Sequence, residues 1–166
     1  MIAKIMGITD EDVLDRAWDL GIAFQLPNIA RDVMDDAKAD RVFVPQSLFH
    51  DKGIKGTVKE LLDQRNLPII HEAVIVQLSL ADRYYRSSKA GIKALPFRCS
   101  WAMYAALNVY SDIGSRIKKQ GPSAWSNRVS SSHLRKLYLS LLALFSIFLN
   151  KTAVDVSREN LYQRPR

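Results

Sequence analysis

Apolar residues recur with the spacing of α-helices along nearly the whole chain, and no stretch alternates as a half-buried strand would. Glycines and prolines interrupt this pattern between the periodic segments. The segments predict four long helices, at about 10–38, 67–93 and 97–120, with the fourth beginning after one of the serines at 130–132 and ending at about 149. Four antiparallel helices make an all-α bundle, and ligand sites in such bundles form between facing helices.

Capping residues and prolines set the expected ends of these helices. Thr9, followed by Asp12, resembles a capping box, and one of the serines at 130–132 is expected to cap the fourth helix. Pro27 lies inside the first helix and should kink it, because proline removes one backbone N–H donor. The residue before a proline avoids the α conformation, so the segment leading to Pro45 is expected to be extended.

Length and composition fit one globular domain. The chain has 166 residues, of which 48% are apolar and 25% charged, which is enough to bury a core. We expect residues 1–150 to form the domain and residues 151–166 a loosely structured tail. The single Cys99 fits a reducing compartment, and the first residues lack the plan of a signal peptide. The apolar run 137–149 is too short to span a bilayer, so the sequence predicts a cytoplasmic protein.

The charge is unevenly distributed, and this restricts the choice of partners. Residues 1–50 carry a net charge of −4 and residues 51–166 a net charge of +11. A basic region can meet nucleic acid, an anionic membrane surface or a phosphorylated substrate. The three tryptophans lie among apolar residues, which argues against nucleic acid. Arg135 and Lys136 precede the run 137–149, for which core packing is the simpler interpretation and peripheral contact with the inner face of a membrane the alternative.

The stretch FQLPNIARDVMDDAKADRVFVP (24–45) concentrates acids in a basic protein. At 100° per residue, one helix face of roughly 140° collects its polar residues. They are Gln25, Asn28, Arg31, Asp32, Asp35 and Asp36. Carboxylates this close repel each other unless water screens them or a cation joins them. A solvated face is one interpretation. Magnesium carrying a phosphorylated substrate is the other, because Asp is a poor helix former and Asn and Gln add neutral oxygen ligands.

The same stretch resembles the second aspartate-rich signature of the squalene/phytoene synthase family. Every spaced position is filled, by Leu20, Gly21, Gln25, Asn28, Arg31, Asp32, Asp36, Arg41, Phe43 and Pro45. The resemblance continues in ADRYYRSSKAGIKALPFRCSWAM (81–103), VYSDIGSRIKKQGPSAW (109–125) and LYQRP (161–165). It covers essentially the whole chain and is strongest to the bacterial phytoene synthases of carotenoid biosynthesis. It implies an all-α helical bundle of the isoprenoid-synthase type.

The resemblance also implies a reaction and a metal. Family members of this branch are prenyltransferases that condense two geranylgeranyl diphosphates head to head into phytoene, through prephytoene diphosphate. In family terms Asn28, Asp32 and Asp36 hold Mg²⁺, with Mn²⁺ as an alternative, on the diphosphates. The catalytic residues implied are Arg31, Asp32 and Asp36. No NADPH is expected.

Further residues take roles from the same resemblance. Gln25, Arg31 and Arg41 are implied to bind substrate. Some tyrosines lie on helices that could line an apolar cavity and stabilise a carbocation, although core packing is the simpler interpretation for them. They are Tyr84, Tyr85, Tyr104 and Tyr110. Pro27 departs from the family, which usually has a small polar residue such as Thr there.

Two other functions stay open on the sequence alone. One is the condensation of two farnesyl diphosphates, as in squalene or dehydrosqualene synthases. The other is a non-catalytic, basic helical binding module in which the acidic helix face is merely solvated. Family members are also nearly twice as long as this chain and carry a first aspartate-rich motif on an earlier helix. The chain therefore resembles the C-terminal portion of such an enzyme.

This last feature predicts that the 166-residue chain alone does not turn over. Half of the metal site that the family uses has no counterpart in it, so the diphosphate would lack part of its charge compensation. The measurement is phytoene formation from geranylgeranyl diphosphate with Mg²⁺. Product above the level of a heat-denatured control would contradict the prediction.

Overall fold

The computed structural model describes residues 7–126, 132–149 and 157–165, and these contain helices, turns and loops without a β-strand. Four long helices carry the architecture: α2 (Glu11–Lys38), α4 (Leu67–Ile92), α5 (Phe97–Gln120) and α6 (His133–Leu149). The short elements are η1 (Gln46–Lys52), α3 (Val58–Leu62), η2 (Gln64–Asn66) and η3 (Gly121–Trp125). The all-α prediction is confirmed, and the predicted ends of the long helices hold within one or two residues.

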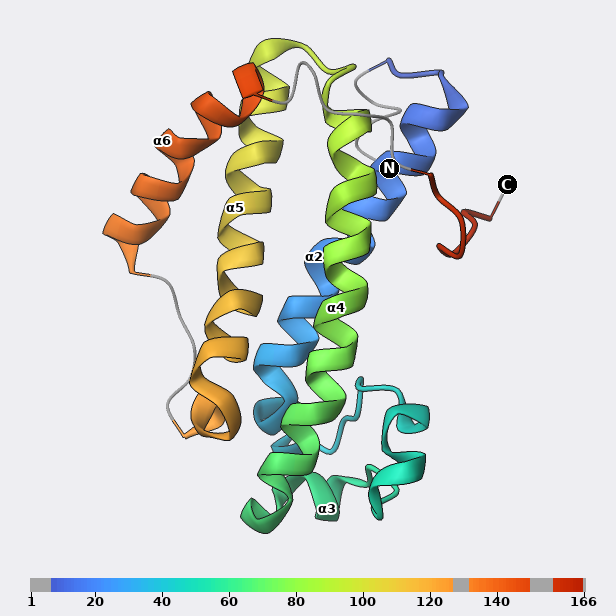
Figure 1. Ribbon diagram of the computed structural model, residues 1–166, viewed down its shortest axis with the longest axis vertical. Coiled ribbons are helices and arrows are strands. Elements are labelled where there is room, and N and C mark those ends of the chain that lie inside the picture. Colours follow the sequence, from blue (N-terminus) through green and yellow to red (C-terminus); the bar gives the residue numbers. More distant parts are fainter. Residues whose placement is uncertain (1–6, 127–131, 150–156, 166) are drawn as a thin grey trace.

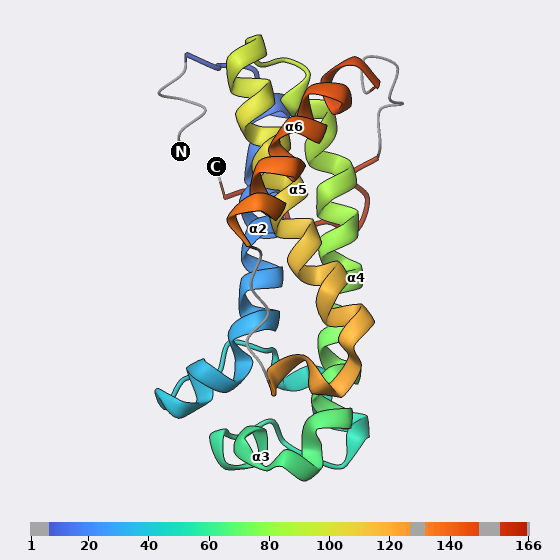
Figure 2. The same ribbon diagram turned by 90° about the vertical axis from the view of Figure 1, so that its left-hand side faces the viewer.

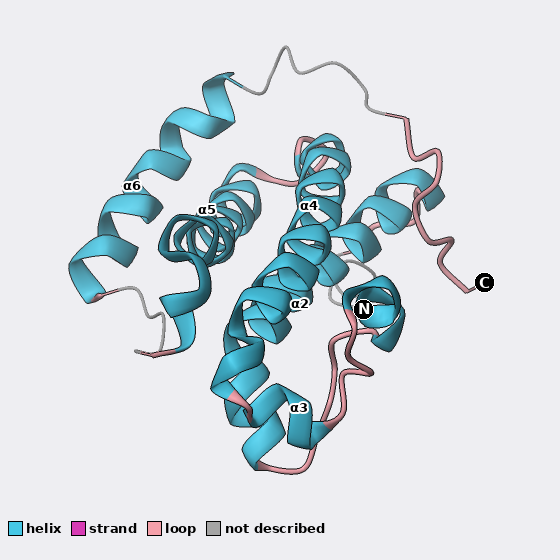
Figure 3. Ribbon diagram, turned by 60° about the horizontal axis from the view of Figure 1, so that its bottom comes forward, coloured by secondary structure: helices cyan, strands magenta, loops and turns pink. Residues whose placement is uncertain are grey.

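The long helices α2, α4 and α5 run side by side, and α6 packs along the outer side of α5 (Figures 1 and 2). The short elements η1 and α3 lie at the end of the bundle where α4 begins (Figure 1), and Figure 3 shows helices and loops but no strand in the described part of the chain. None of the described helices is both long and apolar enough to cross a membrane.

Small residues let α2 approach α4 closely. Ala23, Ala30 and Ala37 are spaced seven residues apart and are almost completely buried. The large apolar side chains of the core come mainly from the partner elements, as with Phe49 of η1 and Ile70 at the start of α4. Because the buried residues of α2 occupy one side, its polar stripe is directed away from this core.

The beginning of α2 differs from the prediction. Asp10, not Thr9, is the N-cap, and its carboxylate accepts the backbone N–H groups of Asp12 (2.9 Å) and Val13 (3.3 Å). Both residue types are good caps, and the capping box at Thr9 was wrong because a carboxylate one residue later performs the same function. Pro27 lies inside α2 without ending it.

The beginning of α6 agrees with the prediction for one of the three serines. The hydroxyl of Ser132 accepts the backbone N–H of Arg135 at 3.3 Å. Residues 130 and 131 lie outside the described part of the chain.

The described C-terminal segment, 157–165, has no helix but is anchored to the bundle by arginines. Arg158 donates two hydrogen bonds to the carboxylate of Asp19, at 2.8 and 2.9 Å, and a third to Asp15 at 2.8 Å. Arg164 binds Asp15 at 2.7 Å. Asp19 has no exposed surface and also accepts the hydroxyl of Ser87 on α4. The predicted domain boundary at 150 stays a prediction, since it falls on undescribed residues.

This anchor predicts a large effect of Arg158→Ala on stability. The variant leaves the Asp19 carboxylate buried without its guanidinium partner, so we expect the free energy of unfolding to fall by about 3 kcal/mol. Urea denaturation followed by circular dichroism measures it.

The matched control is Arg65→Ala, whose partner Asp63 pairs with it at the surface. A surface pair contributes at most about 1 kcal/mol, so this variant should change little. Equal effects of the two substitutions would contradict a buried anchor.

Candidate functional site on the acidic face of α2

The second half of α2 presents the predicted site residues in the order of the helix. Gln25 and Asp35 are exposed, whereas Asn28, Asp32 and Asp36 are half-buried. The structure therefore places these residues on one helix face, as the periodicity predicts. The three predicted metal ligands, Asn28, Asp32 and Asp36, are less exposed to solvent than the other two residues. The apolar side of the same helix turns is packed against α4.

Arg31 and Asp32 form a two-pronged ion pair. Arg31 Nε lies 2.9 Å from Asp32 Oδ1, and Arg31 Nη2 lies 2.6 Å from Asp32 Oδ2. This hydrogen bonding raises the pKa of Arg31 above its ordinary value despite the opposing effect of burial. Arg31 therefore stays charged, and the planar guanidinium keeps further N–H donors that suit phosphate oxygens.

Arg41 reaches Asp36 because of the way in which α2 ends. Asp40 adopts a left-handed conformation (φ 58°), and its N–H donates to the carbonyl of Ala37 at 3.0 Å. The N–H of Arg41 donates to the carbonyl of Asp36 at 2.9 Å, which completes a Schellman motif. The turned chain brings Arg41 Nη2 to 3.3 Å from Asp36 Oδ1. This role of Asp40 was not predicted from the sequence, although aspartate is one of the residues that tolerate this conformation.

The two ion pairs give the face both signs of charge. Asp32 and Asp36 are one helical turn apart, and each carboxylate is matched by an arginine. Asp35 pairs instead with Lys38 at 3.5 Å, and both of these side chains are more than half exposed. Asp32 and Asp36 therefore contact arginines of the predicted site. Asp35 differs from them, because its ion pair is with Lys38 at the surface.

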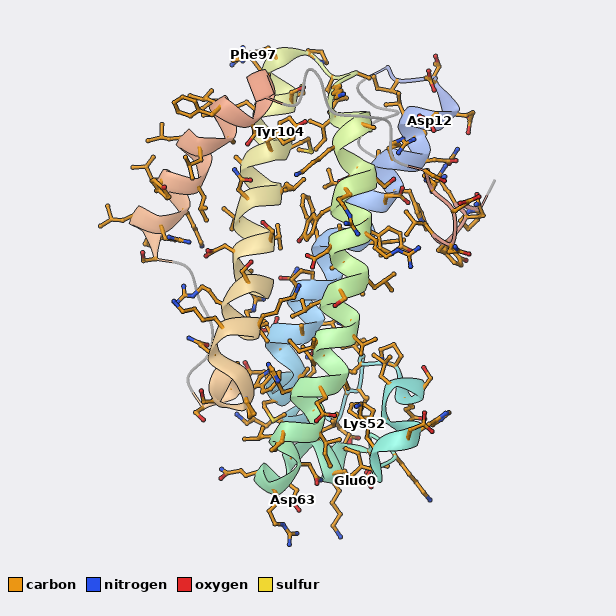
Figure 4. The ribbon with its side chains drawn as sticks, in the orientation of Figure 1. Asp12, Lys52, Glu60, Asp63, Phe97 and Tyr104 are labelled. Atoms are coloured by element: carbon orange, nitrogen blue, oxygen red, sulfur yellow. The ribbon has the colours of Figure 1, made fainter. Side chains whose placement is uncertain are left out.

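The aromatic residues divide into two groups. Phe24 and Tyr110 stack across α2 and α5, with ring centroids 4.6 Å apart and planes 23° from parallel. Tyr84, Tyr85 and Tyr104 are at least 95% buried. Tyr104 lies on the side of α5 that faces α4 (Figure 4). Burial raises the pKa values of Tyr85 and Tyr104, so both hydroxyls are neutral. These three tyrosines are part of the core, which was the simpler of the two interpretations.

The oxygen donors of this helix face can coordinate magnesium only if the oxygens of a phosphorylated ligand complete the coordination shell. Asn28 and Asp36 are eight residues apart, which is about 12 Å along a helix, so they do not reach one ion together. In the described part of the chain, no group of three or more His, Cys, Asp or Glu side chains is placed to hold a metal. Neighbouring donors one turn apart match the way proteins hold Mg²⁺, through one or two carboxylates with phosphate oxygens completing the shell.

Comparison with known proteins places this arrangement in a family. The family model of squalene/phytoene synthase matches residues 1–139. The chain belongs to the squalene/phytoene synthase family. The resemblance predicted from the sequence is therefore confirmed, and the helical structure agrees with it.

Curated relatives from bacteria cover almost the whole chain. It is 39% identical over 99% of its length to a 15-cis-phytoene synthase of Paracoccus sp., and 40% identical over 99% to a phytoene synthase of Pseudescherichia vulneris. In each case the match takes up 53% of the relative. A 15-cis-phytoene synthase of Enterobacter agglomerans is 39% identical, with 56% of its length matched. The chain thus spans about half the length of these relatives. No solved structure matches it significantly.

Proposed function

We propose that this chain supplies one diphosphate-binding face of a phytoene synthase-like prenyltransferase. The reaction is the head-to-head condensation of two geranylgeranyl diphosphates into phytoene, by way of prephytoene diphosphate. The observation that carries the proposal is the pair of carboxylate–guanidinium contacts, Arg31–Asp32 and Arg41–Asp36, on one face of a chain about 40% identical to phytoene synthases. The names of these relatives favour geranylgeranyl over farnesyl diphosphate as substrate.

The residues of this face would share the work of ionising an allylic diphosphate. Asn28 with Asp32, and Asp32 with Asp36, would hold Mg²⁺ or Mn²⁺ as neighbouring donors one turn apart, and the bound metal would neutralise the diphosphate and make it a better leaving group. Arg31 and Arg41 would donate hydrogen bonds to phosphate oxygens, because their guanidinium groups already lie beside the carboxylates. Fixed charges of this kind act where negative charge develops on the leaving group.

The neighbouring aromatic residues support the second requirement of the reaction, which is protection of the cation from water. Gln25 follows Phe24 on α2, and Phe24 is stacked on Tyr110 of α5. Gln25 would orient the substrate at this apolar edge. The face of a tyrosine ring can also stabilise a positive charge. A final deprotonation yields phytoene, so no step requires NADPH.

We also propose that the chain is cytoplasmic and touches the inner face of a membrane through α6. Five large hydrophobic side chains of this helix are between 51% and 80% exposed, namely Leu134, Leu137, Tyr138, Leu141 and Phe145. They follow one side of the helix, beside Arg135, whose partner is Asp112. An apolar helix face with adjoining basic residues suits the interface of an anionic bilayer, where a hydrocarbon substrate and product would partition.

The catalytic proposal is tested in a chimera. The matching half of the Pseudescherichia vulneris relative is replaced by this chain, and phytoene is measured with geranylgeranyl diphosphate and Mg²⁺. The unchanged chimera should make phytoene. Asp32→Asn and Asp36→Asn should each lower kcat/KM by about 100-fold, since each removes a charge that stabilises the leaving group.

Asp35→Asn is the matched control, because it changes an acid of the same helix turn that faces solvent. We expect it to alter kcat/KM by less than about threefold, as a surface charge contributes little. If all three variants retain the activity of the parent chimera, the acidic face is only solvated and the proposal is wrong.

The membrane proposal is tested by sedimentation with vesicles that contain anionic phospholipid, at low salt. The purified chain should sediment with them, and Leu137→Ser with Phe145→Ser should reduce the bound fraction several-fold by removing apolar area. Leu62→Ser is the control, since Leu62 is an exposed leucine at the end of α3. A chain that stays in the supernatant would contradict the contact.

A further inference from the structure

Two side chains from different elements donate hydrogen bonds to main-chain carbonyls in the middle of α2. Gln77 of α4 places Nε2 2.8 Å from the carbonyl oxygen of Leu26. Trp125 of η3 places Nε1 3.0 Å from the carbonyl oxygen of Ala30. Leu26 and Ala30 are one turn apart and lie roughly 160–200° around the helix from Asn28. The two donors therefore hold the side of α2 opposite the acidic face, in the same two turns.

Packing alone does not account for Gln77. Its side chain is 97% buried, and its Oε1 has no hydrogen-bond partner among the described residues. An unpartnered buried amide oxygen costs free energy that a leucine of similar size would avoid. The bond from Nε2 to Leu26 is the contact that a leucine could not make.

Pro27 explains why α2 needs support at this position. It has no N–H, so the carbonyl of Ala23 loses its usual donor four residues later, and the proline ring crowds the same carbonyl. The weakened turn directly precedes Asn28. Gln77 binds the carbonyl on the N-terminal side of the proline, and Trp125 binds one on its C-terminal side.

We infer that Gln77 and Trp125 are positioning residues that fix the rotation of α2, and so aim Asn28, Asp32 and Asp36 at a metal–diphosphate ligand. The orientation of these side chains toward a metal–diphosphate ligand rests on the proposed function. The stabilisation of α2 by the two hydrogen bonds does not depend on it. Side chains of a helix end about 5–6 Å from its axis, so a rotation of roughly 10° moves a carboxylate by about 1 Å. A displacement of about 1 Å can lower a catalytic rate about 100-fold.

The chain offers a matched pair of controls on another helix. Trp101 of α5 donates Nε1 to the carbonyl of Ser140 at 2.9 Å, and Asn108 donates Nδ2 to the carbonyl of Leu139 at 3.1 Å. These are also an indole and a side-chain amide that bind carbonyls in the middle of a helix. Both of these hydrogen bonds run to α6 and not to α2.

The test compares Gln77→Leu and Trp125→Phe with Asn108→Leu and Trp101→Phe in the purified 166-residue chain. Amide hydrogen exchange over residues 28–36 is the readout that needs no metal. We expect it to become about tenfold faster in the first two variants and to stay unchanged in the controls, since exchange reports local opening. Unchanged exchange in Gln77→Leu and Trp125→Phe would overturn the inference, even if all four variants melt at lower temperature.

Binding of Mn²⁺ in the presence of inorganic diphosphate, followed by electron paramagnetic resonance, tests whether Asn28, Asp32 and Asp36 are oriented to bind a metal. Loss of either donor should weaken Mn²⁺ binding about tenfold, as for residues that orient metal ligands, and the controls should bind as the parent chain does. Equal binding by all variants would overturn the positioning role. If the parent chain binds no Mn²⁺, the proposed metal site fails, while the exchange experiment still decides whether the two donors support α2.

Pro27→Thr provides a rescue. It restores an N–H donor to the carbonyl of Ala23, so the effect of Gln77→Leu on exchange should shrink from about tenfold to less than about threefold. An undiminished effect would contradict the link between Gln77 and the proline.

Discussion

The rest of the structure depends on the packing of α2 against α4. The side of α2 that is buried there carries three small residues, Ala23, Ala30 and Ala37. With a small residue every two turns on the buried side, the two helices approach closely and α2 has one defined inner surface. The opposite surface must then face outward, and the sequence places Asn28, Asp32 and Asp36 there. The packing of three alanines thereby fixes the position of a charged site whose own residues repel one another.

Arginines balance that repulsion at both ends of α2, but with different consequences. At the beginning of the helix, Arg158 joins Asp15 and the fully buried Asp19, and the carboxylates have little freedom to bind anything else. At the end, Asp32 and Asp36 keep part of their surface exposed, and neither is fully buried as Asp19 is. The side chain of Arg41 is 60% exposed, compared with 12% for Arg158. Partly exposed pairs can exchange partners with a diphosphate and its cation at a smaller desolvation penalty than buried ones. The two acidic clusters of one helix are thus a structural anchor and a candidate site.

Local sequence information predicted the long helices well. Their periodicity, and breaks such as Gly121-Pro122, fixed them within one or two residues. Features that depend on distant residues were missed. The ion pair between Arg158 and Asp19 joins positions 139 residues apart, and no local pattern in the segment 157–165 predicts it. The short helix α3 was also missed, because five residues are too few to show a period, although its capping box of Thr57 and Glu60 is visible in the sequence. The helical spacing placed Arg31, Asp32 and Asp36 on one face, and the family resemblance selected them from the other polar residues there. The approach of Arg41 to Asp36 depends on the left-handed turn at Asp40, which was not predicted.

We propose that the acids at the end of α2, and not those at its beginning, bind a divalent cation with a diphosphate. Paramagnetic broadening of backbone amide signals in the ¹⁵N-labelled chain, on addition of Mn²⁺ and inorganic diphosphate, tests this most directly, because the broadening falls steeply with distance from the ion. We predict selective loss of the signals of residues 28–36, with residues 11–19 unaffected. Broadening centred on Asp15 and Asp19, or spread evenly over all exposed acids, would contradict it.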